Sequence, residues 1–281
     1  MKNILIKDKE NFEKKLRKIK SDGKDSLHVI CDFDKTLTKA IVKGQRTHTS
    51  IAQIREGGYL SGEYVKKSFA LYDKYHVFEV NNKISDDEKD KKMMEWWSSH
   101  IKLLVEEGMN KGVVDDIIKK KRILLRKCAK DFFKKLHEKN IPLLIFSAGV
   151  GDIIKGYLES EGLLYNNIHI ISNFFDYDKK GMVRDYKSKI IHSFNKDEFA
   201  IKGTKHFDII KQRKNVILIG DSLGDIDMAK GIEHDIILKI GFLNKYIRKN
   251  IKVYEDKFDA VILNDGTMDF IISILKEALQ Q

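Results

Sequence analysis

Two clusters of carboxylates, far apart along the chain, each follow directly on a short apolar run rich in β-forming residues. The run LHVIC at 27–31 leads into DFDKTLT, and the run VILIG at 216–220 leads into DSLGD. Such runs predict buried strands of a parallel sheet, and residues two apart on an extended backbone point the same way. Because open α/β sheets bind ligands at the carboxyl ends of their strands, we expect Asp32, Asp34 and Asp221 to converge in one cleft.

Three carboxylates so close together repel one another unless a cation neutralises them, and Mg²⁺ is a hard cation that prefers oxygen ligands. Magnesium also keeps coordination positions for water and for a substrate phosphate. A carboxylate is itself a nucleophile toward phosphorus, so one acid can attack while another transfers protons. Either cluster alone is equally explained by an Asp that caps a helix or closes a turn. Both together indicate a magnesium-dependent phosphoryl-transfer site.

The remaining pattern predicts an α/β fold with a Rossmann-like parallel sheet that is covered by helices on both faces. Strands are expected at 27–32, 142–146, 168–172, 216–220, 235–240 and 259–263. Helices are expected at 7–20, 127–139, 151–161, 225–231 and from about 267. A β-hairpin is predicted to turn at DKKG, residues 178–181. The charged helix at 7–20 could lie on a membrane surface, but packing on the core explains its pattern better.

A long insertion interrupts this alternation of strands and helices. About 100 residues separate the first cluster from Pro142, whereas elements of an α/β unit are usually joined by a few. We therefore divide the chain into a catalytic core, 1–41 and 126–281, and an inserted helical cap, 42–125, that recognises the substrate. A helical cap over the strand ends excludes water and selects the leaving group.

The predicted cap helices carry two adjacent tryptophans. The helices are expected at 61–72 and from Ser85, where Ser85 and Glu88 have the spacing of a capping box. Trp96 and Trp97 offer flat surface on which an aromatic ring of a ligand can stack. Because adjacent residues on a helix face different ways, we expect at most one of these tryptophans to line the pocket and the other to join the core.

Four pieces of the sequence together resemble the haloacid dehalogenase-type phosphatases: DFDKTLT, Ser147 in FSAGVGD, a downstream lysine, and GDSLGD. Longer stretches are similar to the eukaryotic pyrimidine 5'-nucleotidases, also called cytosolic 5'-nucleotidase III. The similarity covers nearly the whole chain from about Ser26 onward. The stretches that carry it are YHVFEV, MMEWWSSH, IPLLIFSAGVGDII, IISNFFDYD, HSFNK, ILIGDSLGDIDMA and ILKIGFLN.

This resemblance implies a role for each matching acid. Asp32 matches the nucleophile that becomes phosphorylated, and Asp34 matches the acid that protonates the leaving 5'-oxygen and then activates water. Asp32, the backbone carbonyl of Asp34 and Asp221 would hold Mg²⁺. Spacing, rather than the resemblance, suggests a supporting role for Asp225, which would share the face of Asp221 if a helix starts there; the less favoured alternative is an Asp that caps that helix.

The resemblance also implies the groups that bind the substrate. Ser147, the amide of Ala148, and Lys196 in FNK match the groups that grip the phosphate. Glu79 in VFEV matches the residue that recognises the base, where a carboxylate accepts from an amine or a ring N–H. Ser99 aligns near the base with an uncertain register, and an ordinary surface serine explains it nearly as well. Spacing alone would not choose Lys196, because other lysines lie nearby at 187, 189 and 202.

The sequence departs from the family pattern at two places, which concern the preferred base of the substrate rather than the reaction at phosphorus. Asn81 and Asn82 replace the usual Asp-Pro pair, and residues 45–60 match poorly. The first hypothesis is a Mg²⁺-dependent 5'-nucleotidase acting on CMP and UMP, with a nucleoside phosphotransferase side activity. Its rival within the same class prefers 7-methylguanosine monophosphate. A glycosidase is disfavoured, because paired-carboxylate chemistry on sugars has no use for GDSLGD or Ser147.

Composition sets the outer limits of function. With 53 Lys+Arg against 42 Asp+Glu the net charge is +11, which could indicate a nucleic-acid-binding module with a vestigial hydrolase fold. The lysines are scattered along helices without a recognition motif, so we expect no nucleic-acid partner. Two cysteines, Cys31 and Cys128, do not make a disulfide framework, and no apolar stretch approaches membrane-spanning length. We expect a cytoplasmic monomer that binds a small nucleoside monophosphate and contacts no membrane.

Overall fold

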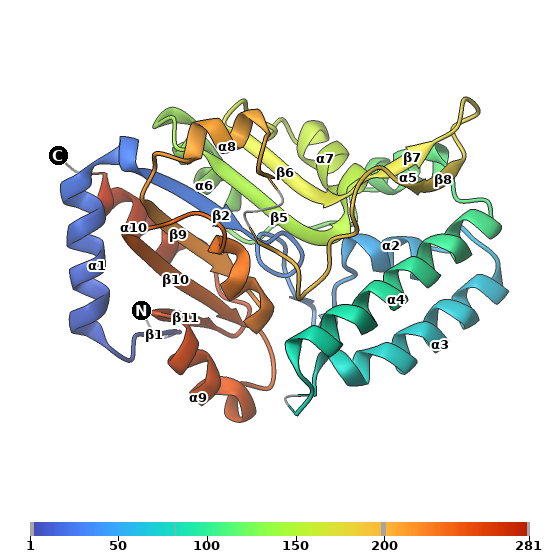
Figure 1. Ribbon diagram of the computed structural model, residues 1–281, viewed down its shortest axis with the longest axis horizontal. Helices are drawn as coiled ribbons and strands as arrows, with labels where there is room; N and C mark the ends of the chain where they lie inside the picture. Colours follow the sequence, from blue (N-terminus) through green and yellow to red (C-terminus); the bar gives the residue numbers. More distant parts are fainter. Residues whose placement is uncertain (1–2, 82, 198–200, 280–281) are drawn as a thin grey trace.

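The computed structural model describes residues 3–81, 83–197 and 201–279, so Asn82 of the first sequence departure lies outside the described residues. Its centre is a seven-stranded sheet in the order β1-β11-β10-β9-β2-β5-β6 (Figure 1). All neighbouring strands are parallel except the short β1, which pairs antiparallel with β11. The strands are β1 Ile4–Leu5, β2 Leu27–Cys31, β5 Leu143–Val150, β6 Ile168–Asn173, β9 Asn215–Gly220, β10 Ile236–Leu243 and β11 Ala260–Leu263. The predicted α/β fold and its six parallel strands are therefore confirmed.

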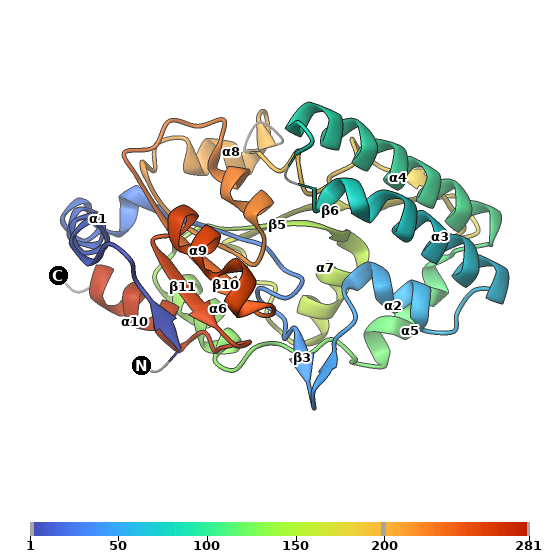
Figure 2. The same ribbon diagram turned by 90° about the horizontal axis from the view of Figure 1, so that it is seen from below.

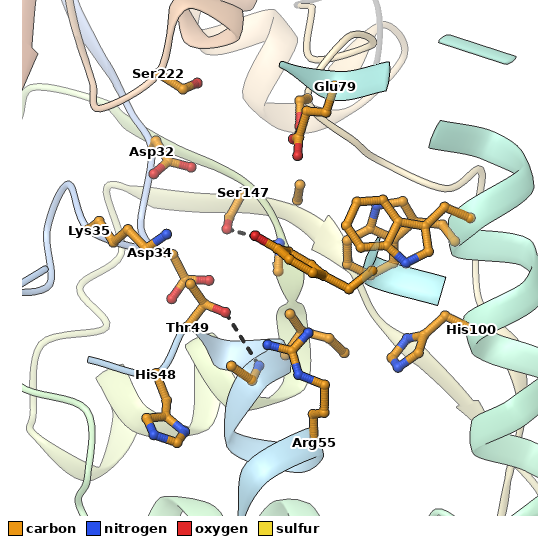
Figure 3. Close-up of a pocket in the computed structure, with 18 of the residues that line it drawn as sticks. Asp32, Asp34, Lys35, His48, Thr49, Arg55, Glu79, His100, Ser147 and Ser222 are labelled. Carbon is orange, nitrogen blue, oxygen red and sulfur yellow. Dashed lines mark hydrogen bonds between the residues drawn. The ribbon is translucent and has the colours of Figure 1, made fainter. Parts of the chain in front are cut away.

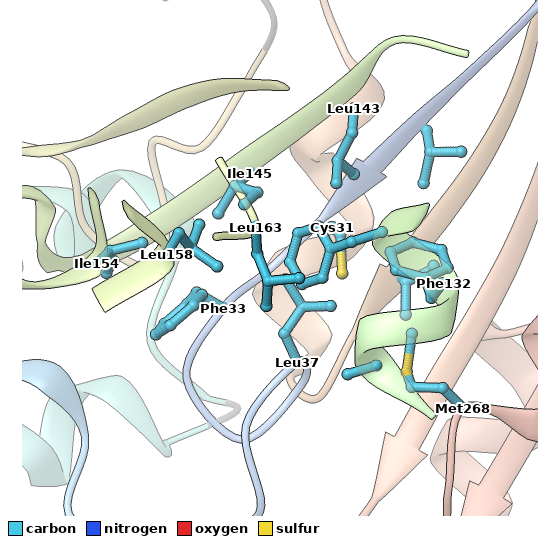
Figure 4. Packing of buried hydrophobic residues seen from close by; sticks show 14 of the residues in the cluster. Cys31, Phe33, Leu37, Phe132, Leu143, Ile145, Ile154, Leu158, Leu163 and Met268 are labelled. Carbon is cyan, nitrogen blue, oxygen red and sulfur yellow. The ribbon is translucent and has the colours of Figure 1, made fainter. Parts of the chain in front are cut away.

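Helices cover both faces of the sheet because side chains alternate along each buried strand. On β2, Val29 and Cys31 face one helical layer while Ile30 faces the other. Figure 4 shows the first layer, where Phe132 packs beside Cys31 and Leu143. That layer contains α1 Lys9–Asp22, α6 Ala129–Glu138, α7 Gly151–Ser160 and α10 Asp269–Ala278. The opposite layer contains α8 Lys205–Ile210, the 3₁₀ helix η3 Leu223–Ala229 and α9 Ile247–Lys257.

The strand order places a ligand site at the centre of the sheet. From β2 the chain continues to β5 and β6 on one side, and it later returns to β9, β10 and β11 on the other. The sheet therefore reverses its direction of growth between β2 and β9, and such a switch point opens a crevice beyond the carboxyl ends of the strands. Asp32 follows β2 and Asp221 follows β9, so both acids lie at this crevice.

The inserted segment leaves and rejoins the sheet at one place. Thr38 and Leu125 form an isolated antiparallel bridge, and the amide of Arg126 donates to Leu37 at 2.9 Å. Between them lie the hairpin β3 Ile41–Val42 and β4 Gln45–Arg46, then α2 Ser50–Glu56, α3 Gly62–Glu79, α4 Asp86–Glu106 and α5 Lys111–Lys119. Figure 2 shows α3 and α4 side by side, away from the helices α1 and α10. Helix α3 begins after its N-cap Ser61 as predicted but continues past Tyr72 to Glu79.

The division into a core and a cap of 42–125 stays a prediction, and two segments cross it. Helix α5 packs against α7, which belongs to the predicted core. The predicted hairpin, β7 Phe175–Tyr177 with β8 Val183–Tyr186, packs in turn against α4. Within the described residues, none of the helices combines the length and apolarity that crossing a membrane requires.

Candidate active site

Asp32 is held at the end of β2 by the neighbouring strand and by a buried lysine. Its backbone amide donates to the carbonyl of Ile219 at 3.0 Å, which continues the pairing of β2 with β9. Its side chain is nearly inaccessible, and Oδ1 accepts from Nζ of Lys196 at 2.7 Å. The same Nζ donates to Oδ1 of Asp225 at 2.8 Å. Although burial opposes the charge of Lys196, the carboxylates of Asp225 and Asp32 raise its pKa, so the side chain is a cation.

Asp32, Asp221 and Asp225 form one acidic group at the switch point of the sheet. Their nearest carboxylate oxygens all lie within 4.8 Å of one another, a spacing that could hold a metal ion. Burial raises the pKa of Asp32 to about 8, although Lys196 opposes the rise. Burial also raises the pKa of Asp221 to about 6. Lys196 therefore offsets only part of the negative charge of the cluster, and a divalent cation that prefers oxygen ligands would offset the rest.

Asp225 holds the tight turn that follows β9 and, through Lys196, is linked to Asp32 at the end of β2. Its Oδ2 accepts from the amide of Asp221 at 3.1 Å, and from the amide and hydroxyl of Ser222 at 2.9 and 2.8 Å. This is the capping arrangement considered for the sequence, and Oδ1 at the same time holds Lys196. The helix that follows is a 3₁₀ helix over Leu223–Ala229, so the predicted helix is present but lies two residues earlier than 225–231. A Cβ on Gly220 would lie 2.4 Å from Cβ of Asp225, so the turn requires glycine there.

Asp34 is oriented by Ser50, the first residue of α2. The amide of Ser50 donates to Oδ1 of Asp34 at 2.9 Å, and its hydroxyl donates to Oδ2 at 2.7 Å. The amide of Val150 donates to the same hydroxyl oxygen at 3.0 Å, so the proton of Ser50 is left for Asp34. Burial raises the pKa of Asp34, and the bonds from Ser50 oppose the rise. A Cβ on Gly149 would lie 2.0 Å from Oγ of Ser50, so only glycine permits this contact.

Ser147 and Ala148 lie at the end of β5, on the opposite side of β2 from β9. Ser147 is buried, and its Oγ accepts from the amide of Gly149 at 3.1 Å. Because that oxygen accepts there, the hydroxyl proton remains available to another acceptor. Asn173 fixes the neighbouring backbone, since its Nδ2 donates to the carbonyls of Ala148 at 2.9 Å and Ile191 at 2.8 Å.

These groups share one cavity of about 560 Å³ between the strand ends and α2, α3 and α4. Figure 3 shows Asp32, Asp34 and Ser147 on one side of it, with Glu79 and His100 reaching it from the helices. The volume lies within the range of pockets that bind small molecules. Of the residues singled out from the sequence, those that line the cavity are Asp32, Asp34, Glu79, Ser147, Ala148, Lys196, Asp221 and Asp225.

Glu79, the last residue of α3, connects the helical wall to the loop that carries Lys196. Its Oε1 accepts from the hydroxyl of Ser193 at 2.6 Å, and its Oε2 lies 3.0 Å from Nδ1 of His76. Burial alone would raise the pKa of Glu79, but the bonds from His76 and Ser193 hold it below the ordinary value. Glu79 is thus a carboxylate that faces the cavity.

The prediction that at most one tryptophan lines the pocket is wrong, because both Trp96 and Trp97 border the cavity, although Trp97 also packs against the core as expected. Adjacent side chains on a helix diverge by about 100°, and the pocket is wide enough for both flanks of α4 to border it. Trp96 is stacked on Tyr75 with ring centres 6.2 Å apart, whereas Trp97 lies 6.3 Å from the ring of Tyr186 on the hairpin. Ser99 is not among the lining residues, and its hydroxyl donates to the carbonyl of Glu95 at 2.7 Å.

Comparisons with known proteins identify the family of the chain. A profile of the pyrimidine 5'-nucleotidase (UMPH-1) family matches residues 35–279. The chain belongs to this family. The nucleotidase is 34% identical to the 7-methylguanosine phosphate-specific 5'-nucleotidase A of Xenopus laevis over 274 residues, which are 97% of this chain and 94% of the relative. The resemblance read from the sequence motifs is therefore confirmed, and the chain is a phosphoric monoester hydrolase of the 5'-nucleotidase class.

Solved structures place the nucleotidase in the same fold. A crystal structure of cytosolic 5'-nucleotidase IIIB bound to cytidine matches it with a TM-score of 0.88 at 28% identity, covering 99% of this chain and 94% of that one. A HAD family hydrolase of Salmonella enterica matches with a TM-score of 0.58 at 14% identity, covering 89% of this chain and 71% of that one, and shows the shared fold. The nucleotidase thus has the haloacid dehalogenase-type fold.

Several residues of the nucleotidase site were not foreseen from its sequence. Ser50, Arg55 and Lys35 line or support the cavity, and Ser193 bonds Glu79. Ser50 and Arg55 lie in the segment that matches the family pattern poorly, so the resemblance offered no guide. A serine beside an N-cap threonine does signal the start of α2, but nothing local indicates that its hydroxyl reaches Asp34.

Proposed function

We propose that the enzyme is a Mg²⁺-dependent 5'-nucleotidase that hydrolyses CMP and UMP to nucleoside and phosphate through a phosphoaspartate at Asp32. The observation that carries the proposal is the convergence of Asp32, Asp221 and Asp225 with Lys196 at one end of the cavity. Catalysis of phosphoryl transfer rests mainly on positioning and on positive charge around the phosphorus, and this end of the cavity offers both.

The residues present fit a magnesium ion. Three neighbouring carboxylates, two of them with raised pKa values, are hard oxygen donors in need of a cation. Asp32, Asp221 and the backbone carbonyl of Asp34 would hold it, and Asp225 would support the site through Lys196 and the turn. Bound Mg²⁺ supplies positive charge that offsets the charge developing on the phosphoryl oxygens.

In the first half-reaction, a carboxylate oxygen of Asp32 attacks phosphorus and the bond from phosphorus to the 5'-oxygen breaks. Lys196 and the Ser147 hydroxyl donate to the phosphoryl oxygens, and the amide of Ala148 adds a third donor. Asp34 gives its proton to the departing 5'-oxygen, which leaves as the nucleoside alcohol. Burial favours the protonated form of Asp34 that this step requires, and Ser50 fixes its orientation.

In the second half-reaction, Asp34 is the base. It takes a proton from a water molecule, whose oxygen attacks phosphorus and releases inorganic phosphate from Asp32. A nucleoside hydroxyl in place of that water would accept the phosphoryl group instead, which gives the phosphotransferase side activity. The wall of α2, α3 and α4 limits the water that reaches the phosphoenzyme.

Glu79 would recognise the base. It is a carboxylate held by His76 and Ser193 at the edge of the cavity, and it can accept from the amine of cytosine or the ring N–H of uracil. Trp96 and Trp97 would provide apolar surface beside the base. Ser99 has no role in this account, because its hydroxyl is bonded within α4 and lies outside the cavity lining.

A second candidate substrate is 7-methylguanosine monophosphate. The Xenopus relative is named for that nucleotide, and the cavity combines several aromatic rings with the carboxylate of Glu79. Aromatic faces attract a cationic base such as 7-methylguanine. The reaction at phosphorus is the same for both candidates, so only the base distinguishes them.

A substrate panel tests the proposal. Phosphate release should be Mg²⁺-dependent and fastest with CMP and UMP, and the panel includes 7-methylguanosine monophosphate. Asp32→Asn should abolish turnover of every substrate and leave the fold intact, whereas the exposed Asp208→Asn should match the wild type. Turnover without added metal in the presence of a chelator, or persistent activity of Asp32→Asn, would refute the mechanism.

We propose a cytoplasmic monomer with a two-part chain, in which residues 42–125 form the cap and the remainder forms the core. A relative of known structure is named a cytosolic 5'-nucleotidase, which supports this location. Its positive charge would serve to attract an anionic nucleotide rather than to bind nucleic acid. Salt-sensitive binding to RNA without turnover of any monophosphate would contradict this.

A further inference from the structure

Arg55, near the end of α2, extends its side chain into the cavity, and Figure 3 shows His100 on the neighbouring wall. The side chain is 17% exposed. Its guanidinium carbon lies 4.7 Å from the centre of the Phe69 ring and 5.5 Å from that of Tyr72, both on α3. Arg55 therefore lies in the aromatic part of the cavity, where the proposed function requires the base to bind.

One edge of this guanidinium has a partner, and the other does not. Nε and Nη2 of Arg55 donate to Oε1 of Glu56 at 3.3 and 2.9 Å. Among the residues that the structure describes, none accepts a hydrogen bond from Nη1. Arginine carries five N–H donors in a planar fork, so the edge away from Glu56 presents positive charge and directed donors to the cavity.

We propose that Arg55 determines base selection by donating to the carbonyl and ring-nitrogen acceptors of a neutral base and by rejecting 7-methylguanine, which carries a fixed positive charge. This inference rests on the proposed function of the site. It assigns the enzyme to neutral pyrimidines and separates it in specificity from the relative that is named for 7-methylguanosine phosphate.

Cytosine, a neutral pyrimidine, matches the hydrogen-bonding groups of Arg55 and Glu79. Cytosine offers its O2 and N3 as adjacent acceptors, which the planar donors of Arg55 can reach as a fork. Its exocyclic amine is then a donor for the carboxylate of Glu79. Guanine likewise offers adjacent O6 and N7 acceptors to an arginine, but methylation of N7 removes one of them.

Charge acts in the same direction. The guanidinium already lies over the rings of Phe69 and Tyr72, so it occupies faces that would otherwise attract a cationic base. Glu56 also lines the cavity and pairs with Nε and Nη2, so the edge of the guanidinium that carries Nη1 is the part that would meet a bound base. Two like charges a few ångströms apart in a partly buried site lower binding by about tenfold or more.

The decisive comparison is between GMP and 7-methylguanosine monophosphate, which differ only in the methyl group and its charge. Steady-state kinetics of the wild type should give a higher kcat/KM for GMP than for its methylated form, with CMP above both. Arg55→Met should raise the ratio of kcat/KM for the methylated nucleotide to that for CMP by about tenfold, mainly through KM. Arg55→Lys keeps the charge but loses the fork, so it should continue to reject the methylated base while binding CMP more weakly.

Controls keep the result interpretable. Arg184→Met removes an arginine exposed on the β7–β8 hairpin and should leave every ratio unchanged. If Arg55→Met does not fold, Arg55→Gln replaces it in the same kcat/KM comparison. The wild-type preference between GMP and 7-methylguanosine monophosphate tests the inference without any variant. A wild type that prefers the methylated nucleotide to GMP, or an Arg55→Met ratio equal to that of the wild type, would overturn the inference. A wild type inactive on every monophosphate would instead overturn the proposed function.

Discussion

Replacing Lys196 with methionine should lower the free energy of unfolding of the enzyme, and added Mg²⁺ should restore part of the loss. The ammonium group lies 2.7 Å from Asp32 and 2.8 Å from Asp225, and all three side chains are at most 6% exposed. Methionine fills much of the volume but leaves two buried carboxylates without a cation. Removing one partner of a buried ion pair costs about 3–5 kcal/mol, which for a chain of this size lowers Tm by about 6 °C or more.

Magnesium should restore part of this loss. A ligand that binds only the folded state adds about 2.7 kcal/mol of stability when its free concentration is a hundred times its Kd. The deficit should also grow as the pH rises, because Lys196 opposes the increase in the pKa of Asp32 that burial causes. Without Lys196 the folded state holds that proton still more tightly than the unfolded state does, so stability falls further as the pH rises. Urea denaturation of Lys196→Met with and without Mg²⁺, at pH 5 and pH 8, measures these effects.

The exposed Lys189→Met is the matched control and should change the free energy of unfolding by no more than about 0.5 kcal/mol. A Lys196→Met variant as stable as the wild type in the absence of metal would show that Asp32 and Asp225 need no cation. The electrostatic account of the acidic group would then be wrong.

Two further predictions concern residues that orient or enclose the site. Gly149→Ala should lower kcat at least about tenfold, because the new Cβ would lie 2.0 Å from Oγ of Ser50 and 2.8 Å from Oδ2 of Asp34. Gly62→Ala is the control, because a Cβ there would meet no atom within 4 Å, and equal kcat for both variants would refute the close contact at Gly149. Burial lowers the pKa of His100 to about 4, so the unfolded state binds its proton first and stability should fall by up to about 3 kcal/mol as the pH drops from about 6.5 to 4. His100→Gln should flatten that part of the curve of unfolding free energy against pH, and an unchanged slope would contradict the assignment.

The core of the fold could be predicted from the sequence because each buried strand is also a short apolar run, and two of these runs lead directly into a functional acid. Asp32 and Asp221 were placed correctly by this local pattern, since parallel strands bring their carboxyl ends to the same edge. The antiparallel β1 was not predicted, because a run of two or three apolar residues at Ile4 acquires meaning only when it pairs with β11. Edge strands of this kind are set by tertiary contacts rather than by pattern.

The helical wall of the site was harder to predict than the strand ends. Trp96 and Trp97 were assigned to different surroundings from helix geometry, yet the cavity is wide enough to border both. Ser50 acts through a hydroxyl that bridges Asp34 to the end of β5, and no local signal reveals such a bridge. Arg55 lies in a segment that matches the family pattern poorly, and its position over two aromatic rings depends on how α2 packs against α3.

The most direct test of the whole account is to trap the enzyme during turnover. Rapid acid quenching of the enzyme with CMP that carries a radiolabelled phosphate, followed by peptide mapping, should find the label on the peptide that contains Asp32. The label should disappear when Mg²⁺ is removed and should be absent from Asp32→Asn. A label on Ser147 or on a histidine, or full turnover with no labelled protein at any time, would contradict the phosphoaspartate mechanism.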